Sequence, residues 1–278
     1  MINPVDGHIF AVDKPLGWSS FHVVKKLRGA LLARLRRVGI RKLKVGHAGT
    51  LDPLATGVML LCTGKATRQI DALQAGRKIY TAEIALGATT PSFDLETPVD
   101  ATFPTAHITR ELVDETLRRF IGRIEQVPPS YSACKVDGKR AYALARKGED
   151  PGLKPKVLVI DDISLLSFSP ELITIRVVCS KGTYIRALAR DIGSALGSGG
   201  YLASLRREGV GDYLIEDCLG IEEAEHLVRT SPMAVTADDG SLLEVPPLTE
   251  APPRMSTLSQ ADILPWNMRI KPTDEAPE

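Results

Sequence analysis

A glycine-rich stretch near the start of the chain holds one carboxylate and one imidazole close together. Residues 46–57 read GHAGTLDPLATG, so His47 and Asp52 are its titratable side chains. Pro53 biases Asp52 towards an extended backbone, and the flanking glycines permit turns that a Cβ would hinder. Such a loop can present the carboxylate into a cleft, where an ionised group is available for catalysis. The alternative is an aspartate that caps a turn.

Sequence patterns for several other chemistries are incomplete. Residues 64–65 resemble the end of a phosphate-binding loop, but Met59 and Ala66 stand where that loop needs glycine and serine or threonine. Residues 197–202 lack the third glycine of a dinucleotide loop. The five histidines and four cysteines show no zinc-ligand spacing, and no G-x-S-x-G nucleophile elbow occurs. We therefore expect no metal and no redox or nucleotide cofactor.

Charge is distributed unevenly along the chain, whose formal net charge is +1. Residues 14–44 contain ten lysines and arginines and no acidic residue. Such a run is typical of a phosphate-binding surface or of a solvated helix face. Residues 230–278 contain eight acidic and three basic residues, together with eight of the 19 prolines. Because their apolar residues show no helical or strand period, we predict a disordered acidic tail there.

The composition is typical of a globular protein: of 278 residues, 44% are hydrophobic and 25% are charged. No apolar run approaches the roughly 18 residues that a membrane helix needs, and the first residues lack the pattern of a signal peptide. The four cysteines form no C-x-x-C pair, which favours free thiols in a reducing compartment. We expect a cytoplasmic protein that does not bind membranes.

The elements that must position Asp52 are strands and helices without a strict β-α-β alternation. The alternation of apolar residues predicts a strand over residues 78–86, and an apolar stripe predicts a helix from about residue 20 to 37. Further strands are expected at residues 8–12, 58–62, 131–136, 157–168, 172–179 and 201–208, and further helices after residue 64 and at 109–120, 139–147 and 183–196. This mixture predicts an α+β fold with a largely antiparallel sheet flanked by helices. Residues 8–229 are expected to form a single domain.

The motifs of the chain resemble those of one enzyme family. Residues 49–57, GTLDPLATG, resemble the catalytic motif of pseudouridine synthases, in which the aspartate is the catalytic residue. The tRNA pseudouridine-55 synthases, the TruB family, are similar at further positions in the same order. These are residues 12–20 (VDKPLGWSS), 45–49 (VGHAG), 127–142 (VPPSYSACKVDGKRAY), 179–186 (CSKGTYIR) and 205–207 (LRR).

This resemblance implies a pseudouridine synthase-like fold and a reaction at uridine 55, in the T-loop of tRNA. The N-glycosidic bond breaks, the base turns, and a C–C glycosidic bond forms to the same ribose, without a cofactor. Asp52 would be the ionised nucleophilic or electrostatic catalyst. It could attack C6 of the base, attack C1′ of the ribose, or abstract a ribose proton.

The resemblance also implies roles for side chains far from Asp52 in sequence. Arg186, in the TYIR motif, is expected to pair with the catalytic carboxylate. Tyr80 is expected to stack on the target base or to serve in the proton step. Tyr184 would be a second tyrosine of the pocket or a core residue. His47 is expected to help to hold the flipped-out uridine, and Lys14 to pack beside the catalytic loop with a mainly structural role.

The implied partner is the T-arm stem-loop of tRNA. Basic residues 25–44 would contact phosphates, and the shape of the RNA would supply selectivity. We expect a monomer, because the protein must wrap a stem-loop. Residues 230–278 are too few and too unpatterned for the PUA-type domain that often follows the family's catalytic core. Asp94 stands where many members carry a T-x-T-x-D pattern, but with different neighbours, so it is a weaker site candidate.

Two alternatives remain open from the sequence. The chain could be a non-catalytic RNA-binding or RNA-folding protein on the same scaffold, or a pseudouridine synthase for a different RNA position. Replacement of Asp52 separates the first alternative from catalysis, and mapping of modified positions separates the second.

Overall fold

The computed structural model describes residues 1–132, 134–136, 138–237 and 239–248. The helices are α1 (Ser20–Leu35), α2 (Ile70–Ala75), α3 (Arg110–Arg118), α4 (Ala141–Ala145), α5 (Ile185–Ala195) and α6 (Ile221–Thr230), with short 3-10 turns η1 (Arg36–Val38), η2 (Gly64–Gln69) and η3 (Ile215–Asp217). The longer strands are β1 (Ile9–Lys14), β3 (Ala55–Thr63), β4 (Lys78–Leu86), β7 (Gly122–Gln126), β10 (Lys156–Phe168), β11 (Leu172–Cys179) and β12 (Gly200–Val210). The shorter strands are β2 (Val45–His47), β5 (Ala88–Thr89), β6 (Ala101–Thr102), β8 (Lys135–Val136), β9 (Lys139–Arg140), β13 (Tyr213–Leu214), β14 (Leu219–Gly220), β15 (Ala234–Thr236) and β16 (Leu242–Glu244).

One ten-stranded sheet runs through the molecule. Its strand order is β14-β1-β3-β12-β4-β11-β10-β7, with β2 added beside β3 and β13 beside β12. Only the β1–β14 and β3–β12 pairs of this sheet are parallel, within the described residues. The prediction of an α+β fold with a largely antiparallel sheet is therefore confirmed.

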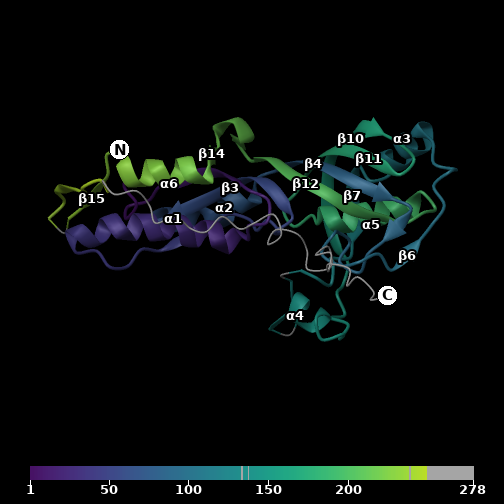
Figure 1. Ribbon diagram of the computed structural model, residues 1–278, viewed down its shortest axis with the longest axis horizontal. Helices are drawn as coiled ribbons and strands as arrows, with labels where there is room; N and C mark the ends of the chain where they lie inside the picture. Colours follow the sequence, from purple (N-terminus) through teal and green to yellow (C-terminus); the bar gives the residue numbers. More distant parts are fainter. Residues whose placement is uncertain (133, 137, 238, 249–278) are drawn as a thin grey trace, which may run out of the picture.

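Helices cover the two halves of this sheet separately, and each half has its own apolar cluster. Figure 1 shows α1 and α6 side by side at one end, α3 and α5 at the other end, and α4 standing apart from the sheet. Leu27 and Val228 are fully buried in the first cluster, against β1 and β3. Ile84, Ile175 and Leu188 are fully buried in the second, which joins α5 to β4, β10 and β11. The central strands β3, β12 and β4 connect the two halves.

Most predicted elements occur close to their expected positions. The strands at residues 78–86 and 172–179 have the predicted bounds, and the helix expected to run to about residue 37 is α1 followed by η1. The strand expected at residues 131–136 is reduced to β8 within the described part of that segment. Helix α6 and the edge strand β7, whose exposed positions alternate with partly buried ones, were not predicted.

The first part of the expected acidic tail is folded, which corrects the boundary predicted at residue 229. Strands β15 and β16 pair with each other, and Met233, Val235 and Val245 are buried in the α1–α6 cluster. The side chain of Arg34, itself fully buried, donates hydrogen bonds to the carbonyl oxygens of Val228, Ser231, Val245 and Pro246. The remaining predicted tail, residues 249–278, lies outside the described residues.

All four cysteines are free thiols. Among the described residues, no helix combines the length and the apolar character needed to span a bilayer.

We expect Arg34→Met to lower the free energy of unfolding by about 2–4 kcal/mol, because it leaves several buried carbonyl groups without a donor. Arg37→Met is the matched control. Arg37 lies on η1, directly after the same helix, and is exposed. Among the described residues, its hydrogen bond with this segment is to the Pro247 carbonyl oxygen. Arg37→Met should lower the free energy of unfolding by less than about 0.5 kcal/mol. Urea unfolding measures both values, and equal losses would show that the buried contacts do not anchor the C-terminal strands.

Candidate active site

The loop that carries Asp52 joins β2 to β3, and its backbone is held in place by residues of the motif at positions 12–20. Ser20 forms two hydrogen bonds with Leu51: its hydroxyl accepts from the Leu51 N–H at 2.9 Å and donates to the Leu51 carbonyl oxygen at 3.0 Å. The Gly17 N–H donates to the Pro53 carbonyl oxygen at 2.8 Å. The backbone on both sides of Asp52 is therefore fixed, which leaves its side chain free to point outward.

Lys14 lies beneath this loop and is fully buried. Its ammonium group donates to the carbonyl oxygens of Trp18 at 2.6 Å, Pro15 at 2.9 Å and Pro53 at 3.5 Å. Burial lowers the pKa of Lys14 to about 8, while the negative charge of Asp52 acts in the opposite direction. Lys14 thus contacts the Asp52 loop from inside the protein.

The Asp52 carboxylate pairs with Arg186 at the first turn of α5. The distance between Asp52 Oδ2 and Arg186 Nη2 is 2.9 Å. The arginine side chain is 5% exposed and the aspartate side chain is 45% exposed. The guanidinium is therefore a buried, fixed partner for a carboxylate that is open to solvent and to a substrate.

A second carboxylate contacts the same guanidinium. Asp94 Oδ2 lies 3.5 Å from Arg186 Nε, and its side chain is only 6% exposed. Burial raises the pKa of Asp94, while Arg186, the Ser92 hydroxyl and the Glu96 N–H lower it. Arg186 also donates to the Ser92 carbonyl oxygen at 3.2 Å. Asp94 thus helps to orient Arg186 from the side away from the solvent.

Asp52 and Arg186 open into a cleft of about 550 Å³. Tyr80 from β4 and Tyr184, directly before α5, line the same cleft, so four predicted site residues converge there. The other charged residues that line it are all basic: Lys78, Lys156, Lys181 and Arg207. Asp52 is therefore the one anion among the described residues of a positively charged cleft. No group of three or more His, Cys, Asp or Glu side chains in the described part of the chain could hold a metal ion.

The two tyrosines differ in their surroundings. Tyr80 is almost buried, at 8% exposure, and burial raises the pKa of its hydroxyl while the positive charge of Arg207 opposes this change. The Tyr184 hydroxyl lies 3.2 Å from the Cys134 thiol. Burial, followed by the contact with Cys134, raises the pKa of Tyr184 to about 12. Both phenols therefore remain neutral near pH 7 and present a flat ring to the cleft.

His47 is not among the residues that line the cleft. It ends β2, where it pairs with Leu61 of β3, and its buried Nδ1 atom has no hydrogen-bond partner within the described part of the chain. Burial lowers the pKa of His47, and the nearby charge of Arg207 acts in the same direction. His47 therefore borders the Asp52 loop as a neutral side chain.

The basic stretch at residues 14–44 is only partly available for phosphate contacts, which narrows the sequence prediction. Lys14 and Arg34 are buried, Lys26 pairs with Glu225 at 2.6 Å, and Arg28 donates to the Leu43 carbonyl oxygen. The exposed members that remain besides these and Arg37 are Lys25, Arg36, Arg41, Lys42 and Lys44.

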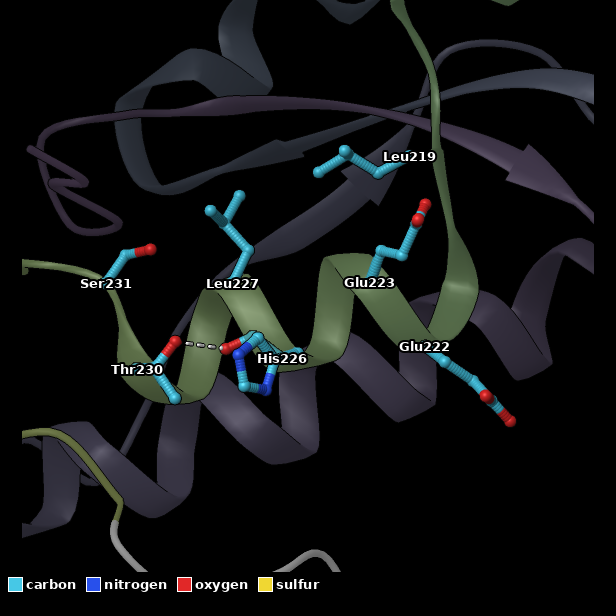
Figure 2. Close-up of a pocket in the computed structure, with 7 residues that line it drawn as sticks. All are labelled: Leu219, Glu222, Glu223, His226, Leu227, Thr230 and Ser231. Atoms are coloured by element: carbon cyan, nitrogen blue, oxygen red, sulfur yellow. Dashed lines mark hydrogen bonds between the residues drawn. The ribbon is translucent and has the colours of Figure 1, made fainter.

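A second hollow, of about 390 Å³, lies along α6 and shares no residue with the cleft. Figure 2 shows Leu219 and Leu227 at its centre, with Glu222 and Glu223 at one end. No predicted site residue lines it.

Comparison with known proteins identifies the family. The model of the TruB family pseudouridylate synthases, for their N-terminal domain, matches residues 36–185, more than half of the chain. The chain belongs to the TruB family. The resemblance noted in the motifs is thereby confirmed, and the matched region includes Asp52, Tyr80, Asp94 and Tyr184.

Relatives in the TruB family are similar over most of their length. The tRNA pseudouridine synthase B of Phocaeicola vulgatus is 63% identical over 221 residues, which cover 80% of this chain and 93% of the relative. The protein of the same name from Flavobacterium johnsoniae is 49% identical over 218 residues, covering 78% of this chain and 94% of the relative. The described α+β fold is thus the fold of a TruB family member.

Solved structures show the same fold in longer proteins. A chain of a Cbf5–Nop10–Gar1 complex is 28% identical, with a TM-score of 0.58, and the match covers 79% of this chain and 53% of that chain. A chain of an H/ACA RNP bound to a substrate RNA containing 2′-deoxyuridine is 25% identical, with a TM-score of 0.55, covering 79% and 52%. This TruB family chain therefore spans about half the length of these two chains.

Sequence reasoning gave no site role to the four further basic cleft residues of this TruB family member, Lys78, Lys156, Lys181 and Arg207. Lys78 is 6% exposed, and its ammonium group donates to the carbonyl oxygens of Gln74 and Gly76. Arg207 is 1% exposed. The LRR motif signalled Arg207, but its partners could not be read from the sequence because they lie far away in the chain.

The buried Lys14 makes a prediction about stability. Its pKa is 10.5 in the unfolded chain and about 8 in the folded protein, so between these pH values the unfolded state binds more protons and stability rises with pH. The Lys14→Met variant has no titrating group at this position, so its stability lacks this dependence on pH. The stability of the wild type relative to the variant should therefore increase by about 3 kcal/mol between pH 7.5 and pH 10.5. Urea unfolding across this range checks it, and a pH-independent difference would contradict the burial of a charged Lys14.

Asp94 makes a second prediction. Asp94→Asn keeps the side-chain shape but removes one of the two negative charges that orient Arg186, so we expect kcat for uridine isomerisation to fall about 10-fold, equivalent to about 1.4 kcal/mol. The KM should stay unchanged, because Asp94 does not line the large cleft. Asp191→Asn is the control. Asp191 lies on α5, the helix that carries Arg186, and among the ion pairs of the described residues it contacts only Arg190. A KM effect without a kcat effect would contradict this role.

Proposed function

We propose that the chain isomerises the uridine at position 55, in the T-loop of tRNA, to pseudouridine. Its family membership and its relatives make it an enzyme that converts uridine in tRNA to pseudouridine. The proposal adds the position and the T-arm as the bound structure. The observation that carries it is the half-exposed Asp52 carboxylate, paired at 2.9 Å with buried Arg186 in a cleft whose other charged groups are cationic.

The carboxylate is the reacting group in this proposal. The Arg186 guanidinium fixes one oxygen of Asp52 at 2.9 Å. The other oxygen remains free to attack C6 of the base or C1′ of the ribose, or to remove a ribose proton. In each case the electron pair of the N-glycosidic bond passes to the base, which turns and bonds to C1′ through C5. The carboxylate is then released, or returns the ribose proton that it removed. The C5 proton leaves and N1 takes up a proton, so the reaction needs no external oxidant or reductant.

The cleft suits a flipped-out nucleotide. A base in a T-loop is stacked, so it must leave the stack before a carboxylate can reach its glycosidic bond. The rings of Tyr80 and Tyr184 offer stacking surfaces inside the cleft. Lys156 and Lys181, also in the cleft, can neutralise phosphates beside the flipped nucleotide. These contacts support RNA rather than a free nucleoside as the substrate.

The two other predicted site residues, Lys14 and His47, do not line the cleft. Lys14 holds the backbone at Pro53, so we assign it a positioning role rather than direct contact with RNA. His47 borders the catalytic loop, and we propose that it supports the flipped-out arrangement after RNA binding rearranges its buried ring. Exposed lysines and arginines after α1 would extend the phosphate contacts beyond the cleft.

We further propose that the described residues up to Leu248 form one catalytic unit, which acts as a monomer in the cytoplasm. The single sheet that connects both halves supports one unit. The burial of β15 residues against α1 extends this unit beyond the residue 229 that the sequence predicted.

We expect Asp52→Asn to lower tritium release from tRNA labelled at uridine C5 by about 10³-fold or more, because the amide cannot supply the ionised oxygen. Binding of tRNA should stay within about twofold, since only one of the charged groups of the cleft changes. Asp161→Asn, at an exposed aspartate paired with Arg77, is the control and should keep full turnover.

Position mapping completes the experiment. In tRNA from cells that lack the protein, uridine 55 should be unmodified, and the wild-type gene should restore pseudouridine there. Normal turnover by Asp52→Asn, or a missing modification at another position with uridine 55 still converted, would refute the proposal.

A further inference from the structure

Arg207 occupies the centre of the sheet, between β3, which follows the Asp52 loop, and β4, which carries Tyr80. It lies on β12, which pairs with β3 on one side and β4 on the other. Its direct neighbours across the strands are Gly57 of β3 and Tyr80 of β4. The side chain is 1% exposed, so a full positive charge is enclosed at the floor of the cleft.

The guanidinium of Arg207 contacts both ends of the loop that carries Asp52. Its Nε donates to the Val58 carbonyl oxygen at 2.7 Å, after the loop. Its Nη2 donates to the Gly49 carbonyl oxygen at 3.1 Å, and Nη1 lies 3.5 Å from the Thr50 carbonyl oxygen, before Asp52. One planar group thus ties together two backbone segments that Asp52 separates.

The backbone of Arg207 is fitted to the loop as closely as its side chain. Gly57 has φ +105°, and a Cβ added there would lie 2.2 Å from the Arg207 carbonyl oxygen. Only glycine permits this approach. The end of the loop is therefore packed directly against β12, at the residue whose side chain reaches back to its beginning.

No carboxylate of the described residues forms an ion pair with Arg207, whereas neighbouring Arg206 pairs with Asp13 at 2.8 Å. A buried cation without a counter-ion is costly unless its N–H groups are satisfied. Here three backbone carbonyl oxygens accept hydrogen bonds from the guanidinium, and the Tyr80 hydroxyl is a further side-chain partner. The positive charge of Arg207 also affects two nearby side chains. It lowers the pKa of His47, and it opposes the rise that burial causes in the pKa of Tyr80.

We propose that Arg207 is a positioning residue for catalysis, whose guanidinium fork clamps the two ends of the Asp52 loop and so aims the carboxylate at Arg186 and the cleft. This inference rests on the proposed function of the same site. Lysine cannot replace it, because a single ammonium group lacks the planar fork that reaches three carbonyl oxygens.

Arg207→Lys tests the clamp, since it keeps the charge and removes the fork. We expect kcat for tritium release from tRNA to fall about 10- to 100-fold, because a small misplacement of a reacting group has effects of this size. The KM and the Kd for tRNA should stay within about twofold of the wild type. Arg176→Lys, at a partly exposed arginine of β11 paired with Asp162, is the matched control and should keep the wild-type kcat.

Single-turnover rates with saturating enzyme separate positioning from a general loss of folded protein. The melting temperature and the fraction of active sites that bind tRNA are measured in the same samples. A wild-type kcat in Arg207→Lys would overturn the clamp, and so would an unchanged kcat with a raised KM, which would make Arg207 a substrate-binding group.

If Arg207→Lys does not fold, the wild-type protein supplies the answer. The Nε–H signal of Arg207 in ¹H–¹⁵N spectra should exchange slowly with solvent and keep its position when the T-arm stem-loop is added. Rapid exchange, or a large shift on RNA binding, would overturn the clamp. Failure of the proposed function is distinguishable, because wild-type enzyme would then leave uridine 55 of tRNA unconverted.

Discussion

The ion pair between Asp52 and Arg186 is the interaction on which the site depends. A carboxylate in water has no fixed orientation, but this one is held at 2.9 Å from a guanidinium that is itself 5% exposed, which fixes its direction. The two residues lie far apart in the sequence. They meet because the loop before β3 and the start of α5 both reach the same cleft beside the central strands of the sheet.

Three buried basic side chains hold separate segments of this fold together. Arg34 joins α1 to the C-terminal strands, Arg207 spans the catalytic loop, and Lys14 supports that loop from below. Each is satisfied largely by backbone carbonyl oxygens rather than by carboxylates. Such contacts are specific in direction, because every N–H must find an acceptor once it is removed from water. The acidic groups of the centre, Asp52 and Asp94, therefore remain available to Arg186.

The sequence predicted the regular elements well where periodicity was strong. Strands β4 and β11 have alternating burial that the sequence displays directly. Helix α6 was missed because its buried face is narrow, with Ala224 and Val228 fully enclosed. Composition could not reveal that residues beyond it complete the core around α1.

The candidate site was predictable only in part. The spacing around Asp52 indicated a presented carboxylate, but its pairing with Arg186 came from family resemblance, since no local pattern links residues so far apart. Conversely, the basic run at residues 14–44 suggested a continuous phosphate surface, yet Arg34 and Lys14 point inward. A basic side chain looks the same in a sequence whether it binds RNA or a buried carbonyl group.

A crystal structure of the chain bound to a T-arm stem-loop tests the central claim most directly. The account predicts that the uridine at position 55 is flipped into the cleft, with its glycosidic bond within about 3.5 Å of an Asp52 carboxylate oxygen and its base against Tyr80. An RNA bound along another face, with Asp52 facing an empty cleft, would contradict it.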